Sequence, residues 1–423
     1  MRFASIDEKW IARLLVVGIA VSMTRAFALT NILEVSLFLF VLLNNNLRAC
    51  VVASLRDLRV IFIIIFWMWV GFTSLWSEAT TLESFKEWWS WRKLILVPIC
   101  FALFDTEKSK EILAASIVAI CILFLFASWL GALGIVESSR PPSGLLENHS
   151  TQGLLFGYSA YVCLSMLHRS EKSIWRMLLV ALAIIFAANV VFITTGRTGY
   201  VSILIFCLIM VVLAGTSAKK LLVGLLCALS VVALIFINDK SRQNLTQTWD
   251  SAWLEIETEQ GALDSTTIRI WMWKNTIDVV KKHRWLGTGA GGFEAEYSDV
   301  VSKYDGARSV TVDDPHNQYL HIAAEHGIVG LIIFLLAIFS WLYGFLLKQT
   351  ALNVWSRLGL GILVVTAVNG LYNGHFSAFV EGRLCWIAIA SFASGSEKLS
   401  LDQLKSLILS GRTNAKNLSR SNR

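Results

Sequence analysis

The sequence predicts an all-α polytopic membrane protein, and three observations support this fold class. Hydrophobic residues make up 55% of the 423 residues and charged residues only 16%, whereas charged residues reach about a quarter of a typical soluble domain. Apolar runs near the length that spans a bilayer, about 17 to 25 residues, recur along the chain. Many of the 17 tryptophans flank these runs, as is typical of rings at the headgroup level. The bilayer is therefore expected to be the main solvent of this protein.

The apolar runs predict about 12 transmembrane helices. They lie near residues 11–27, 29–43, 59–76, 93–104, 111–134, 152–167, 177–193, 199–214, 221–238, 327–347, 357–373 and 383–394. The runs at 93–104 and 383–394 are the shortest and the weakest of the set. No small-residue cleavage signature follows the first run, so we expect the first helix to be retained.

The distribution of basic residues predicts the orientation. With both termini cytoplasmic, twenty of the 37 lysines and arginines lie in cytoplasmic segments and seven in short outer loops, as the positive-inside rule requires. The expected domains are transmembrane helices 1–9 (1–238), a periplasmic helical domain (239–326), transmembrane helices 10–12 (327–394) and a cytoplasmic tail (395–423), which contains a short amphipathic segment at 401–408.

The long outer segment is expected to be a small helical domain on the membrane surface. Apolar spacing predicts helices at 244–259 and 266–283, the second with its apolar face at Ile270, Trp273, Ile277 and Val280. Residues 287–292 read G-x-G-x-G-G, and no βαβ unit surrounds them, so we interpret them as a turn rather than a dinucleotide loop.

Composition argues against several other functions. The net charge of +7 is explained by topology, since no basic run with interleaved aromatic residues suggests nucleic acid. The seven cysteines show no CxxC pair or metal-like spacing and are interpreted as packing residues. His316, His321 and His326 recur every five residues, which is not the spacing of a helical zinc motif, so no metal and no other cofactor is expected.

The segment DDPHNQYLHIAAEHGIVG is the strongest functional candidate. Asp314 is expected to cap a helix with Pro315 at its first position, which places His316 in the first turn. The helix dipole there disfavours protonation, so the imidazole could accept a proton, and the helix end would attract an anion. A histidine that only helps to cap the helix is the alternative.

This segment resembles the O-antigen ligase and polymerase superfamily. The resemblance rests on H-N-x-x-L followed by E-x-G-x-x-G, which comprises His316, Asn317, Leu320, Glu325, Gly327 and Gly330. Two arginine motifs, TTGRTGY with Arg197 and STTIRIW with Arg269, extend it, and the helix layout with its long outer loop makes it cover the whole chain.

The resemblance implies a metal-independent, inverting glycosyltransferase that uses an undecaprenyl-diphosphate-linked glycan at the periplasmic face of a Gram-negative inner membrane. His316 would be the general base, and Arg197 and Arg269 would bind the donor diphosphate, because guanidinium groups bind phosphate oxygens bidentately. Asp314, Asn317 and Glu325 are possible supporting residues.

Four further basic residues are weaker candidates for donor binding, namely Arg140, Lys86, Arg92 and Lys93. Basic residues that flank a helix often extend to lipid headgroups instead. Arg383, which opens the last predicted helix, is interpreted as a partner in a local ion pair.

The expected reaction transfers O-antigen polysaccharide to lipid A-core in lipopolysaccharide biosynthesis. An O-antigen polymerase and a protein O-oligosaccharyltransferase differ only in the acceptor, and no residue in the sequence separates these alternatives. A transporter of lipid-linked sugars is the alternative from another class. It is disfavoured because the predicted spans are nearly free of charge apart from edge residues such as Arg13 and Glu34, whereas transporters place charged residues near the midplane.

Overall fold

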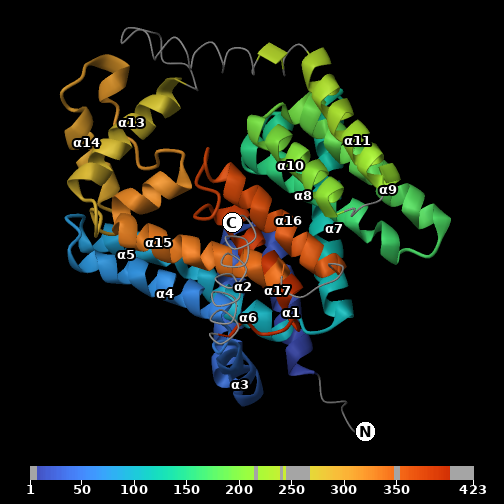
Figure 1. The fold of residues 1–423 in the computed structure, drawn as a ribbon, viewed down its shortest axis with the longest axis horizontal. Helices are drawn as coiled ribbons and strands as arrows, with labels where there is room; N and C mark the ends of the chain where they lie inside the picture. The colour runs from blue at the N-terminus through green and yellow to red at the C-terminus, as the bar shows by residue number, and fades with distance from the viewer. Residues whose placement is uncertain (1–6, 214–217, 239–241, 244–266, 347–352, 401–423) are drawn as a thin grey trace, which may run out of the picture.

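The computed structural model describes residues 7–213, 218–238, 242–243, 267–346 and 353–400, and these residues form helices and loops without strands. Figure 1 shows the helices as a bundle with α13 and α14 at one corner and α9, α10 and α11 at another. The helices are α1 Glu8–Ser22, α2 Phe27–Leu43, α3 Asn45–Ser54, α4 Leu58–Phe72, α5 Thr81–Ser90, α6 Leu96–Leu103, α7 Glu107–Ala132, α8 His149–Met166, α9 Ser173–Asn189, α10 Arg197–Leu213, α11 Ala218–Ile237, α13 Thr267–Lys282, α14 Phe293–Val301, α15 Gln318–Leu346, α16 Val354–Asn369 and α17 Phe379–Ala393.

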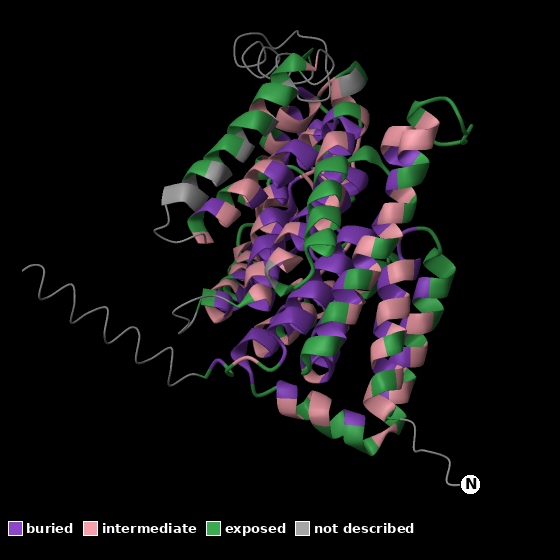
Figure 2. Cartoon of the chain, turned by 90° about the vertical axis from the view of Figure 1, so that its right-hand side faces the viewer, coloured by how far each residue is buried: buried purple, intermediate pink, exposed green. Residues whose placement is uncertain are grey.

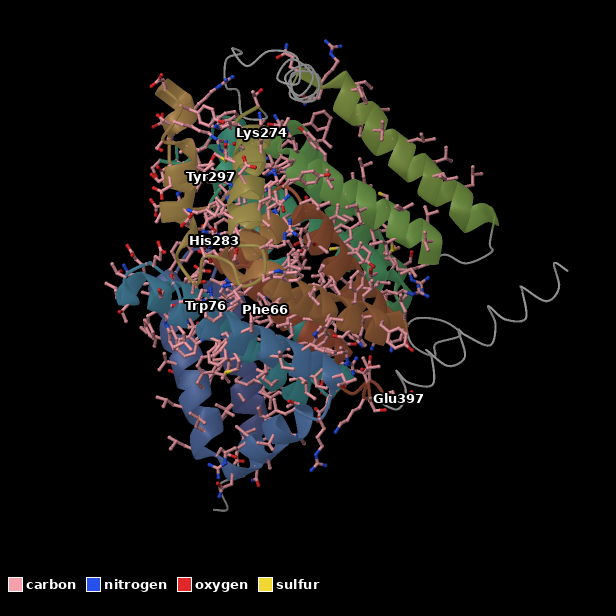
Figure 3. All side chains as sticks on the ribbon, turned by 60° about the vertical axis from the view of Figure 1, so that its left-hand side comes forward. Phe66, Trp76, Lys274, His283, Tyr297 and Glu397 are labelled. Carbon is pink, nitrogen blue, oxygen red and sulfur yellow. The ribbon has the colours of Figure 1, made fainter. Side chains whose placement is uncertain are left out.

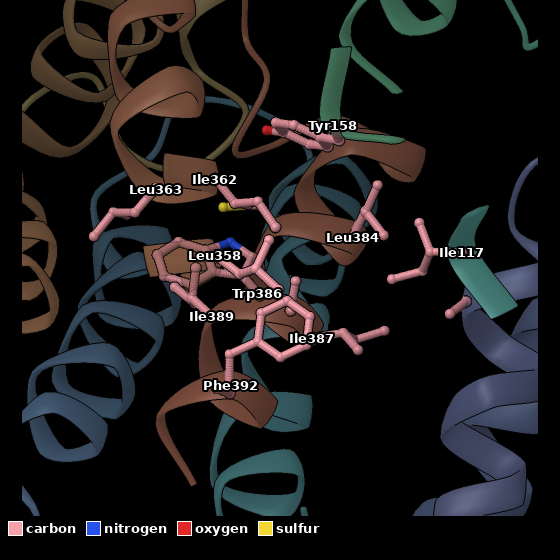
Figure 4. Packing of buried hydrophobic residues seen from close by; sticks show 14 of the residues in the cluster. Ile117, Tyr158, Leu358, Ile362, Leu363, Leu384, Trp386, Ile387, Ile389 and Phe392 are labelled. Carbon is pink, nitrogen blue, oxygen red and sulfur yellow. The ribbon is translucent and has the colours of Figure 1, made fainter. Parts of the chain in front are cut away.

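The centre of the bundle is α17, which includes the last predicted span. Its residues from Val380 to Ala393 are all buried. Trp386 is fully buried and packs in a cluster with Leu358 and Ile362 of α16 and with Phe392 of its own helix (Figure 4). A helix that is apolar on all sides is stable only when other helices surround it, which explains why this short run occupies the core.

The outer surface of the bundle is apolar. Large hydrophobic side chains such as Leu42, Leu123, Phe126 and Ile184 are more than half exposed. Figure 2 shows exposed and intermediate residues on the outward faces of the helices and buried residues between them. An apolar exterior of this extent requires lipid rather than water as its surroundings.

Four helical segments in the described part of the chain are long and apolar enough to cross a membrane. They are Leu58–Leu75, Glu107–Ala132, Ser173–Thr194 and Gln318–Leu346, and α2 with α3 makes a fifth if this pair, bent by 99°, is one span. The remaining helices that fall on predicted spans are shorter or less apolar, so the count of 12 stays a prediction. The run at 93–104 forms only the short α6 after a 3₁₀ turn at Trp91–Ile95.

The interior contains a charged cluster that we had not expected. Glu34, which the sequence placed at the edge of a span, lies within α2 and is 1% exposed. Its carboxylate accepts hydrogen bonds from Arg383 Nη2 at 3.2 Å and from Arg92 Nε at 3.1 Å. Arg383 is thus an ion-pair partner as expected, because a buried carboxylate needs such partners, but the pair is not local, since Glu34 is 349 residues away in the chain.

The segment expected to lie outside the membrane contains the predicted helix at 266–283, observed as α13, followed by α14, which the sequence did not predict. The predicted apolar face was wrong, because Ile277 is 42% exposed while Trp271, Asn275 and Val279 are buried. Val279 packs with Phe293 and Tyr297 of α14, and this contact selects the face (Figure 3 labels Tyr297). The expected helix at 244–259 and the tail segment at 401–408 lie outside the described residues.

Candidate active site

A break in α15 lies where the loop after α13 contacts this helix. Gly327 has φ 70° and ψ 178°, so the helix leaves its regular path there. The loop after α13 fills the break with its backbone, because Thr288 N donates to Ala324 O at 2.9 Å and Gly289 N donates to Glu325 O at 2.8 Å. On the other side of the break, Ile328 N donates to Arg284 O at 2.9 Å. The backbone groups released by the break are thus hydrogen-bonded within the protein.

Glycine is required on both sides of this junction. Residues 287–292 form a turn as predicted, with φ 74° at Gly287. A Cβ atom at Gly287 would lie 2.3 Å from Glu325 O, and one at Gly327 would lie 2.1 Å from Trp285 O. The glycine turn at 287–292 and the E-x-G-x-x-G segment therefore fit against each other, and this close backbone approach explains why glycine occupies positions 287 and 327.

His316 lies before α15 rather than in its first turn, which corrects the expected helix start. Its φ is 53°, in the left-handed region, and α15 begins at Gln318. Asp314 Oδ1 accepts a hydrogen bond from His316 N at 2.7 Å. Asn317 caps the helix instead of Asp314, because its Oδ1 accepts from Tyr319 N and Leu320 N, both at 3.1 Å. Asp314 thus holds the backbone at His316, and Asn317 starts the helix.

The two motif arginines lie close to each other in space. Arg197 begins α10, and Arg269 is in the first turn of α13. Burial lowers the pKa of Arg269, and the charge of Arg197 lowers it further. Burial and then the charges of Arg269 and Arg197 lower the pKa of His149 at the start of α8. The N-terminal ends of α8, α10 and α13 therefore bring one imidazole and two guanidinium groups close enough for their charges to interact.

Glycine residues allow the N-terminal ends of α8 and α10 to approach closely. A Cβ atom on Gly153 would lie 2.9 Å from the Cα atom of Gly199, so α8 and α10 touch through glycine. A Cβ atom on Gly196 would lie 3.1 Å from His149 Cδ2, which places the turn before Arg197 against that imidazole. Close approach of this kind is typical of helix packing in membranes.

A cavity of about 740 Å³ opens beside His316. Burial lowers the pKa of His316, and the positive charge of Arg269 lowers it further, while the charges of Asp314 and Asp313 oppose this. The neutral imidazole is therefore favoured, so it can accept a proton. The cavity is lined by Glu83, Lys86, Glu87, Ser90, Asn148, Ser150, Gly291, Glu294, Asp313, Asp314, His316, His321, Glu325, Asn373, Gly374, His375, Ser377, Ala378 and Glu381.

The loop between α16 and α17 supplies site residues that the sequence did not reveal. His375 Nδ1 lies 3.5 Å from Glu381 Oε1, which also accepts a hydrogen bond from Thr151 Oγ1 at 2.6 Å. Asn373 Nδ2 donates to Thr198 Oγ1 at 3.2 Å, next to Arg197 in the chain. Asn373 ends a predicted apolar run, and His375 and Glu381 lie in the short gap before the next run. That position was their only sequence signal.

Glu325 belongs to a second group at the cavity wall. Its Oε1 accepts a hydrogen bond from Gly291 N at 3.1 Å. Glu87, Glu325 and His326 place potential ligand atoms within 4.8 Å of one another. The histidine spacing argued against a metal within α15, but it could not show that Glu87 of α5 joins this group.

The four weaker candidates for donor binding lie in different surroundings in the structure. Lys86 lines the cavity. Arg92 is held by Glu34 and Asn31, and Lys93 donates to the carbonyl groups of Ser377 and Ala378. Arg140 donates to Glu147 O at 3.2 Å in an exposed loop. We therefore leave Arg92 and Lys93 out of the proposed donor site, because both are engaged within the protein. Lys86 and Arg140 stay predictions.

The comparison with protein families supports the resemblance found in the sequence. The model of a family described as O-antigen ligase matches residues 181–335. This span contains Arg197, Arg269 and His316 together with both sides of the Gly287 and Gly327 junction. This match supports membership of the O-antigen ligase and polymerase superfamily.

The match to this family and the apolar helices together indicate a multi-pass membrane protein. An uncharacterized protein of Haemophilus influenzae is 24% identical over 179 residues. The matched region is 40% of this chain and 44% of that relative, so the chain spans less than half of the relative's length.

Proposed function

We propose that this superfamily member transfers O-antigen polysaccharide from undecaprenyl diphosphate to a sugar hydroxyl of lipid A-core at the periplasmic face of the Gram-negative inner membrane. The observation that carries the proposal is the position of His316. Its imidazole lines a large cavity, and the charge of Arg269 acts on it. A proton acceptor and a phosphate-binding group thus meet at one place.

The proposed reaction is a single displacement. His316 takes the proton of the acceptor hydroxyl, and the oxygen attacks the anomeric carbon of the donor sugar. The bond between that carbon and the diphosphate oxygen breaks, the configuration inverts, and undecaprenyl diphosphate leaves. Arg197 and Arg269 stabilise the negative charge that develops on the leaving group, because guanidinium groups keep their proton and bind phosphate oxygens in pairs.

Supporting residues hold these groups in place. Asp314 fixes the backbone at His316, and Asn317 fixes the start of α15 one residue later. Glu325 supports the break in α15 through Gly291. The domain boundaries that follow from this proposal are those expected from the sequence, with 239–326 outside the membrane and both termini in the cytoplasm.

The test uses purified protein with lipid-linked O-antigen and, separately, lipid A-core, a lipid-linked repeat unit and a protein acceptor. The mass of the product identifies the acceptor and separates a ligase from a polymerase or a protein transferase. His316→Ala should reduce the transfer rate by about 10² to 10⁴ while donor binding, measured on the same preparation, persists.

His283→Ala is the matched control. His283 lies in the outer region, where its Nε2 is 3.2 Å from Glu296, and it does not line the cavity. A folded His316→Ala variant with normal turnover would remove the general-base assignment and leave helix support as its role. We would then examine Glu325 and Asp314.

A further inference from the structure

The cavity beside His316 is strongly acidic. Seven of its lining residues carry a carboxyl group, namely two on α5, two in the loop before His316 and one each on α14, α15 and α17, and Lys86 is the one Lys or Arg side chain among the lining residues. Arg197 and Arg269, the proposed donor ligands, are not among the lining residues. The site therefore has a basic end and an acidic end, which meet at His316.

One carboxyl oxygen at the acidic end has no hydrogen-bond partner. Glu325 is 4% exposed, and its Oε2 makes no hydrogen bond within the described part of the chain. The nearest imidazole nitrogens are His326 Nε2, 3.7 Å from Oε2, and His321 Nε2, 3.8 Å from Oε1. A buried polar atom that lacks a partner costs free energy, and a ligand hydroxyl could supply the missing hydrogen bond.

The second buried carboxylate of the cavity is already satisfied. Glu381 accepts from Thr151 and lies beside His375, so its position is fixed within the protein. Glu83, Glu294 and Asp313 are exposed at the cavity and contribute negative charge without being buried. Carboxylates accept hydrogen bonds from sugar hydroxyls and repel phosphate and carboxylate groups.

We infer that the acidic cavity holds the acceptor and selects a sugar without phosphate or carboxylate near the accepting hydroxyl. This inference rests on the proposed glycosyl transfer. The diphosphate of the donor is excluded from the cavity by the same repulsion and stays at Arg197 and Arg269. The basic and acidic ends of the site thus hold the donor and the acceptor on opposite sides of His316. Any phosphate of a lipid A-core acceptor must then lie outside the cavity.

The experiment compares two acceptors that differ in one group. Core oligosaccharides with the same terminal sugar, with and without a phosphate next to the accepting hydroxyl, are offered to the full-length protein with lipid-linked O-antigen in EDTA. We expect kcat/KM to favour the neutral acceptor by about tenfold or more, because several carboxylates within a few ångströms each repel the phosphate. Glu83→Gln and Asp313→Asn should each reduce this preference by roughly twofold to tenfold.

Asp278→Asn is the control for the loss of one negative charge. Asp278 is on α13, pairs with Lys281 at 2.8 Å and does not line the cavity, so its removal should leave the preference unchanged. If a Gln or Asn variant folds poorly, the native protein is assayed at increasing salt concentration instead. Salt screens the carboxylates, so the preference for the neutral acceptor should weaken.

Other results would contradict the inference in distinct ways. Equal kcat/KM for the two acceptors, or a preference for the phosphorylated one, overturns it while leaving glycosyl transfer established. Transfer to the phosphorylated acceptor that is restored by Mg²⁺ also overturns it, because the carboxylates would then serve a cation. Absence of transfer to either acceptor contradicts the proposed function itself.

Discussion

Asp314 Oδ1 accepts a hydrogen bond from His316 N at 2.7 Å, and the negative charge of Asp314 raises the pKa of the His316 imidazole. Burial and Arg269 act in the opposite direction, and the net pKa of His316 is lowered. One carboxylate therefore fixes the position of the proposed base while moderating the loss of its basicity. The balance of charges around His316 leads to a directional test.

The pH dependence of transfer should follow these charges. A general base works when neutral, and the ordinary pKa of histidine is about 6.5. Because the pKa of His316 is lowered, kcat/KM should stay on its plateau as the pH falls through 6.5 and decline only below it. Arg269→Gln should shift the acid limb to higher pH, and Asp314→Asn should shift it to lower pH.

Profiles of kcat/KM against pH, each normalised to its own plateau, test this prediction. Normalisation removes the loss of activity that either substitution causes through donor binding or loop position. If both variants shift the acid limb in the same direction, His316 is not the group that titrates.

Arg197→Lys and Arg269→Lys should each lower kcat/KM by about tenfold or more, which corresponds to about 1.4 kcal/mol of transition-state stabilisation. A lysine keeps the charge but cannot reproduce the planar, bidentate contact with a diphosphate. Kinetics with lipid-linked donor measure the effect, and Arg284→Lys, an exposed position after α13, is the control. Full activity of both lysine variants would reduce these arginines to packing or topology.

Transfer should proceed in excess EDTA and without ATP. The bond to the diphosphate supplies the driving force, and the arginines take the place of a metal at the leaving group. The group formed by Glu87, Glu325 and His326 is the alternative that this assay tests, because these residues could hold a divalent ion. Turnover that disappears with chelator and returns with a divalent cation would assign a metal to the site.

Gly327→Ala should destabilise the protein more than Gly306→Ala. Both glycines have positive φ, 70° and 63°, but a Cβ atom at Gly327 would lie 2.1 Å from Trp285 O, whereas Gly306 has open space. Alanine at Gly306 should cost only about 1 to 2 kcal/mol for its left-handed conformation. Gly327 combines a conformation that is nearly exclusive to glycine with a backbone clash.

Thermal unfolding in detergent measures the two variants under one condition. A lower melting temperature for Gly327→Ala, together with reduced transfer, would show that the junction holds the site. Equal melting temperatures would mean that the break in α15 can relax without Gly327.

The sequence predicted the helical class well because hydrophobic length and periodicity are local properties. It predicted α13 but chose the wrong face, since Asn275 is buried while Ile277 is exposed. It also treated Glu34 as a residue at the edge of a span, because the partners of that carboxylate come from segments far away in the chain. Burial of a polar residue depends on those partners, and no local pattern contains them.

The candidate site also combines features that follow from local sequence with features that depend on contacts between distant segments. By itself, the sequence determined the all-helical membrane class, the turn at 287–292 and the family motif with Arg197, Arg269 and His316, because these depend on composition, glycine and short spacing. Only the tertiary structure decided that Asn317 rather than Asp314 starts α15 and that His149, His375 and Glu381 join the site. The physical reason is that capping, electrostatic proximity and cavity lining are set by contacts between segments that meet only after the bundle has packed.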